Sequence, residues 1–177
     1  MRCIRFVCAL ILGVALCGPN SARASESERL NVVASFSILG DMATRVGGEL
    51  VKVHTLVGPD GDAHVYEPTP EDAKNIADAD VVILNGLGFE GWMVRLIHAS
   101  GYQGPVVVAT SGIVPLSVGE PDAPPDPHAW QSLANAPYYV QNLARAFSKA
   151  DPEHTVLYQA NAAAYQQELG ALEKWAK

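Results

Sequence analysis

Residues 30–57 read LNVVASFSILGDMATRVGGELVKVHTLV, and this stretch decides the fold. It opens with an apolar strand pattern over 30–35, continues with a helical pattern over 38–46, and closes with a β-rich run over 50–57. The Gly47-Gly48 pair is a natural stop for the helix. A strand, a helix and a second strand in this order predict a parallel βαβ unit.

The same alternation continues along the rest of the chain. A cap at Thr69, followed by Pro70, predicts a helix that runs to Ala79. The later elements are expected to be a strand over 80–84, a helix over 90–99, a strand over 104–109, a helix over 137–147 and a long helix over 151–177. The predicted fold class is therefore α/β, with a parallel four-stranded sheet, helices on both faces and a long C-terminal helix.

The first 24 residues have the features of a secretory signal peptide. A positively charged start precedes an apolar run over 6–17, which is too short to span a bilayer. A small-x-small ending predicts cleavage after Ala24 and a soluble periplasmic product. A lipoprotein signal at Cys17 competes with this interpretation, but Leu16 before it is not a small residue.

The composition beyond residue 24 excludes several classes of function. The remaining 153 residues match one domain of ordinary size, and their nine basic and 19 acidic residues give a formal net charge of −10. We expect no nucleic-acid partner, because phosphate binding needs a basic surface. All three cysteines lie before residue 24, so a metal would be bound through nitrogen and oxygen.

Two histidines lie on proline-flanked loops, within the segments 58–70 and 126–130. Prolines restrict a loop before a ligand arrives, which lowers the entropy lost on binding. His64 follows the second strand pattern and His128 follows the fourth. Both loops therefore reach the carboxyl edge of the predicted sheet, where such folds bind ligands. We interpret His64 and His128 as two ligands of a metal site, although a stable site normally needs four.

Other candidate ligands have more ordinary interpretations. The remaining histidines are interpreted as surface or internally satisfied groups: His54, His98 and His154. Four carboxylates neighbour the two loops and could ligate a metal or orient an imidazole: Asp60, Asp62, Glu67 and Asp126. Turn formation by the aspartates, and a favourable interaction of Glu67 with the following helix, are preferred over direct ligation.

The segment Gly86-Leu-Gly88-Phe-Glu-Gly91 is a literal G-x-G-x-x-G between a strand and a helix. It leaves a dinucleotide-binding oxidoreductase domain as an alternative function. Three features count against it: Glu90 would lie beside the pyrophosphate, the next strand ends without an acid for the ribose, and the motif follows the third strand. We prefer a tight turn here, and the sequence has neither a G-x-S-x-G elbow nor a cysteine nucleophile. We expect no enzyme, because nothing suggests an open coordination position at a metal that is used for chemistry.

Several motifs carry a family resemblance, and in chain order they are Ser35-Phe-Ser-Ile-Leu-Gly-Asp41, Val46-Gly-Gly48, His64-Val-Tyr-Glu-Pro-Thr-Pro70, Glu90-Gly-Trp92 and Asp126-Pro-His128-Ala-Trp130. Over about residues 30–177 the chain resembles the metal-binding solute receptors of bacterial zinc, manganese and iron ABC transporters (solute-binding protein family 9). The resemblance implies capture of a divalent transition metal between two lobes and its delivery to an ABC permease in the inner membrane. It places the metal ligands of the first lobe at His64 and His128.

The chain departs from this family pattern in two places. Ala63 stands where the family usually has proline, and the chain stops at Lys177 inside what resembles the helix that links the lobes. We therefore divide it into a signal peptide (1–24), an N-terminal α/β metal-binding lobe (25–150) and a truncated linking helix (151–177). Without the second lobe and its two ligands, we expect impaired metal binding. An apolar face left exposed on that helix predicts self-association.

The identity of the metal stays open between zinc, manganese and iron. The loop before His128 has no histidine-rich insertion of the kind common in zinc receptors, which favours manganese or iron. The general affinity order of imidazole sites favours zinc instead. A surface adhesion or interaction module is a further alternative role for relatives of this family.

Overall fold

The computed structural model describes residues 29–117 and 124–177, so the expected signal peptide and its cleavage site lie outside the described residues. A parallel four-stranded sheet runs in the order β2-β1-β3-β4. Its strands are β1 (Leu30–Phe36), β2 (Val51–Val57), β3 (Val81–Leu84) and β4 (Val106–Val108). The predicted α/β class and its parallel sheet are thereby confirmed.

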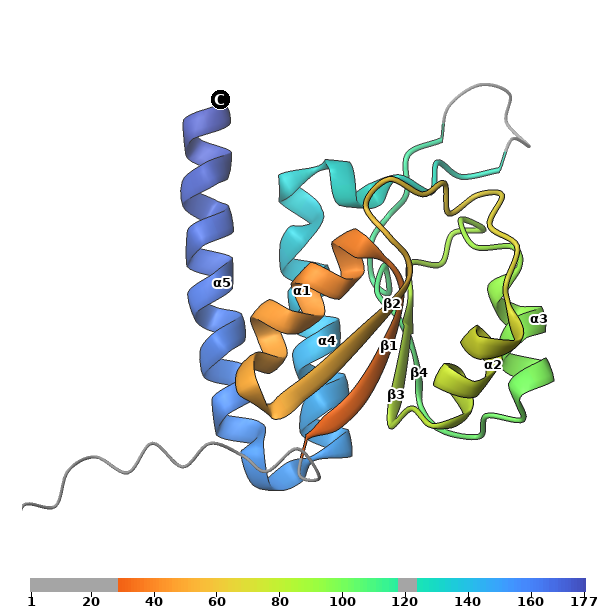
Figure 1. The fold of residues 1–177 in the computed structure, drawn as a ribbon. Coiled ribbons are helices and arrows are strands. Elements are labelled where there is room, and N and C mark those ends of the chain that lie inside the picture. Colours follow the sequence, from red (N-terminus) through yellow and green to blue (C-terminus); the bar gives the residue numbers. More distant parts are fainter. Residues whose placement is uncertain (1–28, 118–123) are drawn as a thin grey trace, which may run out of the picture.

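The described residues form five α-helices, which are α1 (Ser37–Gly47), α2 (Pro70–Ala77), α3 (Met93–Ser100), α4 (Ala136–Ala150) and α5 (Thr155–Ala176). Helices α1 and α4 lie on one face and α2 and α3 on the other, while α5 forms an outer layer against α1 and α4 (Figure 1). The free end of α5 lies on the same side of the molecule as the carboxyl ends of the strands (Figure 1). Helices on both faces and a long C-terminal helix agree with the prediction.

The two central strands carry the core. Val32, Val33 and Ala34 of β1 are at most 2% exposed, as expected for a strand covered on both faces. Val106 and Val108 of the edge strand β4 remain 43% and 39% exposed. Helix α4 contributes a buried stripe at helical spacing, made of Tyr139, Val140, Leu143 and Phe147.

The start of α2 has the predicted cap at Thr69, which forms a capping box with Asp72. The Thr69 side chain accepts a hydrogen bond from Asp72 N, and Asp72 Oδ2 accepts one from Thr69 N at 2.7 Å. The same carboxylate oxygen accepts a bond from the Tyr66 hydroxyl at 2.9 Å. The end of the His64 loop is therefore tied to the first turn of a helix, so that loop is anchored at its far end.

Several element boundaries differ from the prediction; helix α2, for example, ends at Ala77 rather than at Ala79. Helix α3 begins at Met93 rather than at residue 90, because residues 85–92 form a turn closed on a buried carboxylate. Strand β4 spans three residues rather than six, and a bond from Ser111 N to the Val108 carbonyl turns the chain directly after it. A short 3-10 turn over Pro152–His154 precedes α5. In the described part of the chain, none of the helices has both the length and the apolarity to cross a membrane.

Candidate metal centre

The two proposed ligands, His64 and His128, converge at the carboxyl edge of the sheet. Their Nε2 atoms lie 3.1 Å apart and their ring centroids 5.2 Å apart. One ring follows β2 and the other follows β4, so strands at opposite edges of the sheet contribute one each. The structure therefore brings together two side chains that are 64 positions apart in the sequence.

The separation of these nitrogens suits a shared ion. Two nitrogens that each lie 2.0–2.1 Å from one tetrahedral ion are about 3.3 Å apart. The observed 3.1 Å is close to that value. Within residues 29–117 and 124–177, no group of three or more His, Cys, Asp or Glu side chains is arranged to hold a metal. The pair can therefore supply two ligands of a four-ligand shell.

Asp126 orients the ring of His128. Its Oδ1 atom accepts hydrogen bonds from both the main-chain N and the Nδ1 atom of His128, each at 2.8 Å. These bonds, the main-chain bond above all, lower the pKa of Asp126 below its ordinary value of 3.8. A carboxylate can only accept, so the proton sits on Nδ1 and the Nε2 lone pair is left toward His64. The aspartate thus orients the imidazole from behind, which is a common role next to a metal ligand.

An aromatic floor supports both imidazoles from below. The Phe89 ring lies edge-on to His64 at 4.4 Å and to His128 at 5.8 Å between centroids. The Trp130 ring centroid lies 5.2 Å from that of His128 and 4.6 Å from that of Phe89. Phe36 packs against Phe89 and Trp130, with centroids 5.1 Å and 5.0 Å away. Interlocked rings restrict the rotamers of the histidines before any ion arrives. No sequence pattern marks Phe36 or Phe89 as site residues, because only the fold brings them into one cluster with the histidines.

The glycine-rich segment binds a carboxylate of the chain itself. Glu90, 6% exposed, accepts hydrogen bonds from Asn85 N at 2.7 Å, Gly86 N at 3.2 Å and the Ser35 hydroxyl at 2.6 Å. Gly86 and Gly88 have positive φ angles of 88° and 80°, which glycine adopts without strain. The buried Glu90 carboxylate already occupies two amides of this turn, so this geometry opposes the dinucleotide alternative.

The other candidates from the sequence lie outside the pair. Asp62 Oδ1 accepts a bond from His64 N at 2.9 Å, which is a turn role rather than a ligand role. His54 contacts Asn75 at 3.1 Å and His154 contacts Asp151 at 2.7 Å. Asp60, Glu67 and His98 are exposed, and no described contact joins them to the two converging histidines.

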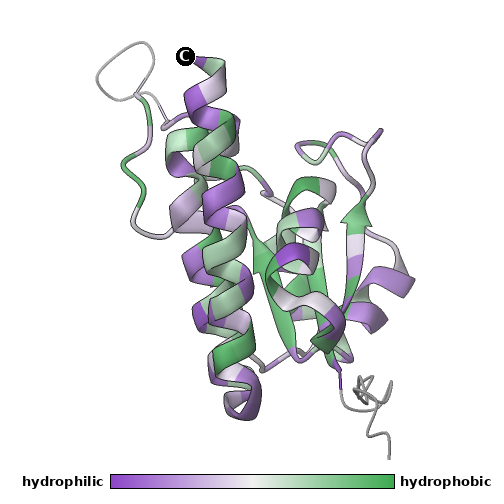
Figure 2. Cartoon of the chain, turned by 90° about the vertical axis from the view of Figure 1, so that its left-hand side faces the viewer, coloured by the Kyte–Doolittle hydropathy of each residue, from purple (hydrophilic) through white to green (hydrophobic). Residues whose placement is uncertain are grey.

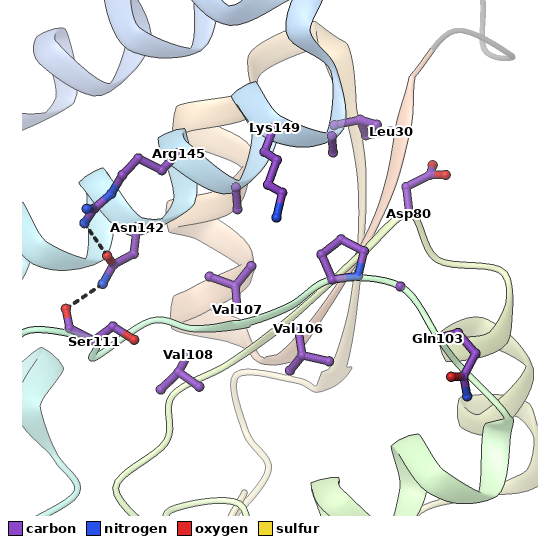
Figure 3. Close-up of a pocket in the computed structure, with 14 residues that line it drawn as sticks. Leu30, Asp80, Gln103, Val106, Val107, Val108, Ser111, Asn142, Arg145 and Lys149 are labelled. Atoms are coloured by element: carbon purple, nitrogen blue, oxygen red, sulfur yellow. Dashed lines mark hydrogen bonds between the residues drawn. The ribbon is translucent and has the colours of Figure 1, made fainter.

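The largest pocket described does not contain the histidines. A groove of about 840 Å³ follows the free edge of β4, between Val106 and Val108 on one side and Arg145 and Lys149 of α4 on the other (Figure 3). A smaller pocket of about 330 Å³ lies beside His128. Converging donor atoms, rather than cavity size, therefore locate the site.

Comparison with known proteins places this geometry in a family. The family described as zinc-uptake complex component A, periplasmic (ZnuA) matches residues 32–177. The chain is 39% identical over 175 residues to the manganese-binding lipoprotein MntA of Halalkalibacterium halodurans, covering 98% of this chain and 58% of that protein. It spans about half the length of the curated relatives that it matches.

Solved structures with the same fold are periplasmic or metal-bound proteins. The Mn-bound periplasmic metal binding protein from Candidatus Liberibacter asiaticus is 37% identical with a TM-score of 0.73, over 77% of this chain and 52% of that one. Zn(II)-bound AdcA from Streptococcus pneumoniae is 28% identical with a TM-score of 0.74, over 82% of this chain and 32% of that one. With a family match that covers most of its length, the chain belongs to the ZnuA family of periplasmic zinc-uptake components.

Proposed function

We propose that this chain captures a divalent transition metal ion, zinc, manganese or iron, through the Nε2 atoms of His64 and His128. The observation that carries the proposal is the 3.1 Å distance between these two nitrogens, next to the ring of Phe89. Asp126 accepts the Nδ1 proton of His128, which leaves the Nε2 lone pair of that ring free for a metal. The metal is cargo rather than a resident cofactor, and the chain acts as a binding protein rather than an enzyme. Its two imidazoles leave two coordination positions for water or for ligands from elsewhere.

Isothermal titration of residues 25–177 with Zn²⁺, Mn²⁺ and Fe²⁺ tests this proposal. We expect one weak site per chain, because the described residues bring two protein ligands together. Loss of a residue that only orients a metal ligand lowers metal affinity by roughly 10–100-fold. His64→Ala and His128→Ala each remove a ligand itself, so each should lower the affinity by more than that. His54→Ala is the matched control, since His54 contacts Asn75 away from the pair. Equal affinities in all four proteins would remove the site assignment.

We further propose that the chain is exported and hands its metal to an ABC permease, with a signal peptide over 1–24 and a metal-binding lobe over 25–150. Support comes from relatives such as MntA, which is described as a lipoprotein, and from periplasmic metal-binding neighbours. Mass spectrometry of the exported protein separates the two signal interpretations. Cleavage after Ala24 leaves an unmodified Ser25 at the N-terminus, whereas a lipoprotein would begin at a lipid-modified Cys17.

Self-association through α5 is the remaining part of the proposal. Val156, Leu172 and Trp175 on this helix are 77%, 46% and 83% exposed. Figure 2 shows apolar stretches between polar ones along α5. Burying such side chains in a second copy removes apolar surface from water. Analytical ultracentrifugation should show concentration-dependent dimers, and Trp175→Glu should abolish them; a monomer at every concentration would disprove this part.

A further inference from the structure

The two histidine loops share one local design. Each is an Asp-x-His triplet, Asp62-Ala63-His64 and Asp126-Pro127-His128. In each, the main-chain N of the histidine donates to Oδ1 of the aspartate two residues earlier, at 2.9 Å and 2.8 Å. This turn leaves the carbonyl of the middle residue without a partner inside the triplet. The position of that carbonyl then depends on a donor from elsewhere in the fold.

Both middle carbonyls are held by buried side-chain donors. Trp92 Nε1 donates to the Ala63 carbonyl at 2.7 Å, and Asn85 Nδ2 donates to the Pro127 carbonyl at 2.9 Å. Trp92 is 4% exposed and Asn85 is fully buried. The Trp92 bond is buried and the Asn85 bond is part-buried, so breaking either one leaves a buried donor without its partner.

The side chain of Asn85 has no alternative orientation. Its Nδ2 atom also donates to the Gly86 carbonyl at 3.1 Å, and its Oδ1 atom accepts from the Tyr139 hydroxyl at 2.7 Å. Exchanging nitrogen and oxygen would set the amide oxygen against two carbonyl oxygens, which is repulsive. The donor to Pro127 is thus fixed in direction by the surrounding contacts.

The two donors belong to one rigid segment. Residues 85–92 are folded around the carboxylate of Glu90, which accepts bonds from Asn85 N and Gly86 N and from Ser35 at the end of β1. Asn85 stands at the start of this segment and Trp92 at its end. One short piece of chain therefore holds both histidine loops, one at each end.

We infer that residues 85–92 form a bracket that sets the spacing of the two imidazoles, with Asn85 positioning His128 and Trp92 positioning His64. The inference rests on the proposed metal site and names what determines its geometry. Neither residue touches the metal, so both act through the loop carbonyls. Their loss should move the rings apart in the metal-free protein and weaken metal binding by about 10–100-fold, the usual effect of losing an outer partner.

The test compares Asn85→Leu and Trp92→Phe with two controls that lose buried bonds elsewhere. Asn142→Leu removes an amide that donates to the carbonyls of Ala109 and Ser111, at 2.8 and 2.9 Å. Tyr158→Phe removes the 2.8 Å bond from its hydroxyl to Asp151. Imidazole ¹H–¹⁵N spectra of the metal-free proteins report ring environment, Zn²⁺ titration reports affinity, and urea unfolding reports stability.

We expect Asn85→Leu to shift the His128 ring signals, Trp92→Phe to shift those of His64, and both to lose affinity, while the controls lose only stability. The bracket is refuted if the ring signals of both variants match those of the controls. Should Asn85→Leu fail to fold, Trp92→Phe alone decides, because phenylalanine keeps an aromatic ring beside Tyr66. A wild-type protein that binds none of Zn²⁺, Mn²⁺ and Fe²⁺ would refute the proposed function, while the metal-free spectra would still decide for or against the bracket.

Discussion

Glu90→Gln tests the energetic weight of the buried carboxylate beneath the site. Gln keeps the shape of Glu but replaces one acceptor oxygen by an NH₂ group. The best placement keeps its carbonyl where Oε1 receives Ser35 and Asn85, which turns the NH₂ toward Gly86 N. Two donors would then face each other across the present 3.2 Å contact.

The magnitude follows from these three bonds. Hydrogen bonds to a charged group contribute about 1.5–3 kcal/mol and neutral ones about 0.5–1.5 kcal/mol, so two bonds weaken by about 1 kcal/mol each. The third is lost and leaves a buried N–H unpaired, at about 1–3 kcal/mol. Relief from burying a charge offsets part of this sum. We expect a net loss of about 2–3 kcal/mol in the free energy of unfolding.

Urea unfolding of residues 25–177, followed by circular dichroism, measures this loss. With a slope near 2 kcal/mol/M, the midpoint should fall by about 1 M. Glu71→Gln is the matched control, because Glu71 is exposed and pairs with exposed Lys74 at 3.0 Å, so it should change stability by less than about 0.5 kcal/mol. Equal midpoints for the two variants would show that the Glu90 bonds do not stabilise the fold as argued.

Substitutions at Gly86, Thr69 and Asp126 provide three further tests. Gly86→Ala should destabilise by at least about 1–2 kcal/mol, because φ is +88° and the new Cβ would lie 2.6 Å from Val108 Cγ1; Gly91→Ala, with nothing within 4 Å, should be tolerated, and thermal unfolding compares the two. Thr69→Ala should cost about 1 kcal/mol through loss of the capping box, and Thr69→Ser should restore most of it in the same assay. The pKa of Asp126 is lower in the folded protein than in the unfolded chain. Its carboxylate therefore stabilises the fold at pH values above the unfolded-state pKa, and this stabilisation is lost as the pH falls through the folded-state pKa. Asp126→Asn should therefore lose less stability than wild type between about pH 5 and about pH 3, and equal losses in urea unfolding would contradict the assignment.

Local signals in the sequence predicted most of the fold. Apolar runs of β-branched residues predicted the strands, Gly47-Gly48 predicted the end of α1, and Thr69-Pro70 predicted the start of α2. These signals act within a few residues, so they are visible without tertiary structure. Parallel βαβ order then placed both histidine loops at one edge of the sheet.

The sequence prediction was wrong where hydrogen bonds between distant residues override the local helix pattern, as at the start of α3. Residues 90–92 continue the helical pattern of the residues after them, yet they lie outside α3. The Glu90 side chain points inward and accepts hydrogen bonds from three donors instead. The repeated Asp-x-His triplet was a signal for the paired turns, and it was present in the sequence all along. No pattern, however, indicates which buried N–H will reach each carbonyl.

The sequence alone determined the fold class, the sheet edge that carries the site and the two histidines on it, because strand periodicity and caps are local properties and parallel topology follows from their order. Tertiary structure decided the 3.1 Å approach of the imidazoles, the aromatic floor beneath them and the donors from Asn85 and Trp92. Those features join residues from separate strands and loops, so their distances exist only once the core has packed.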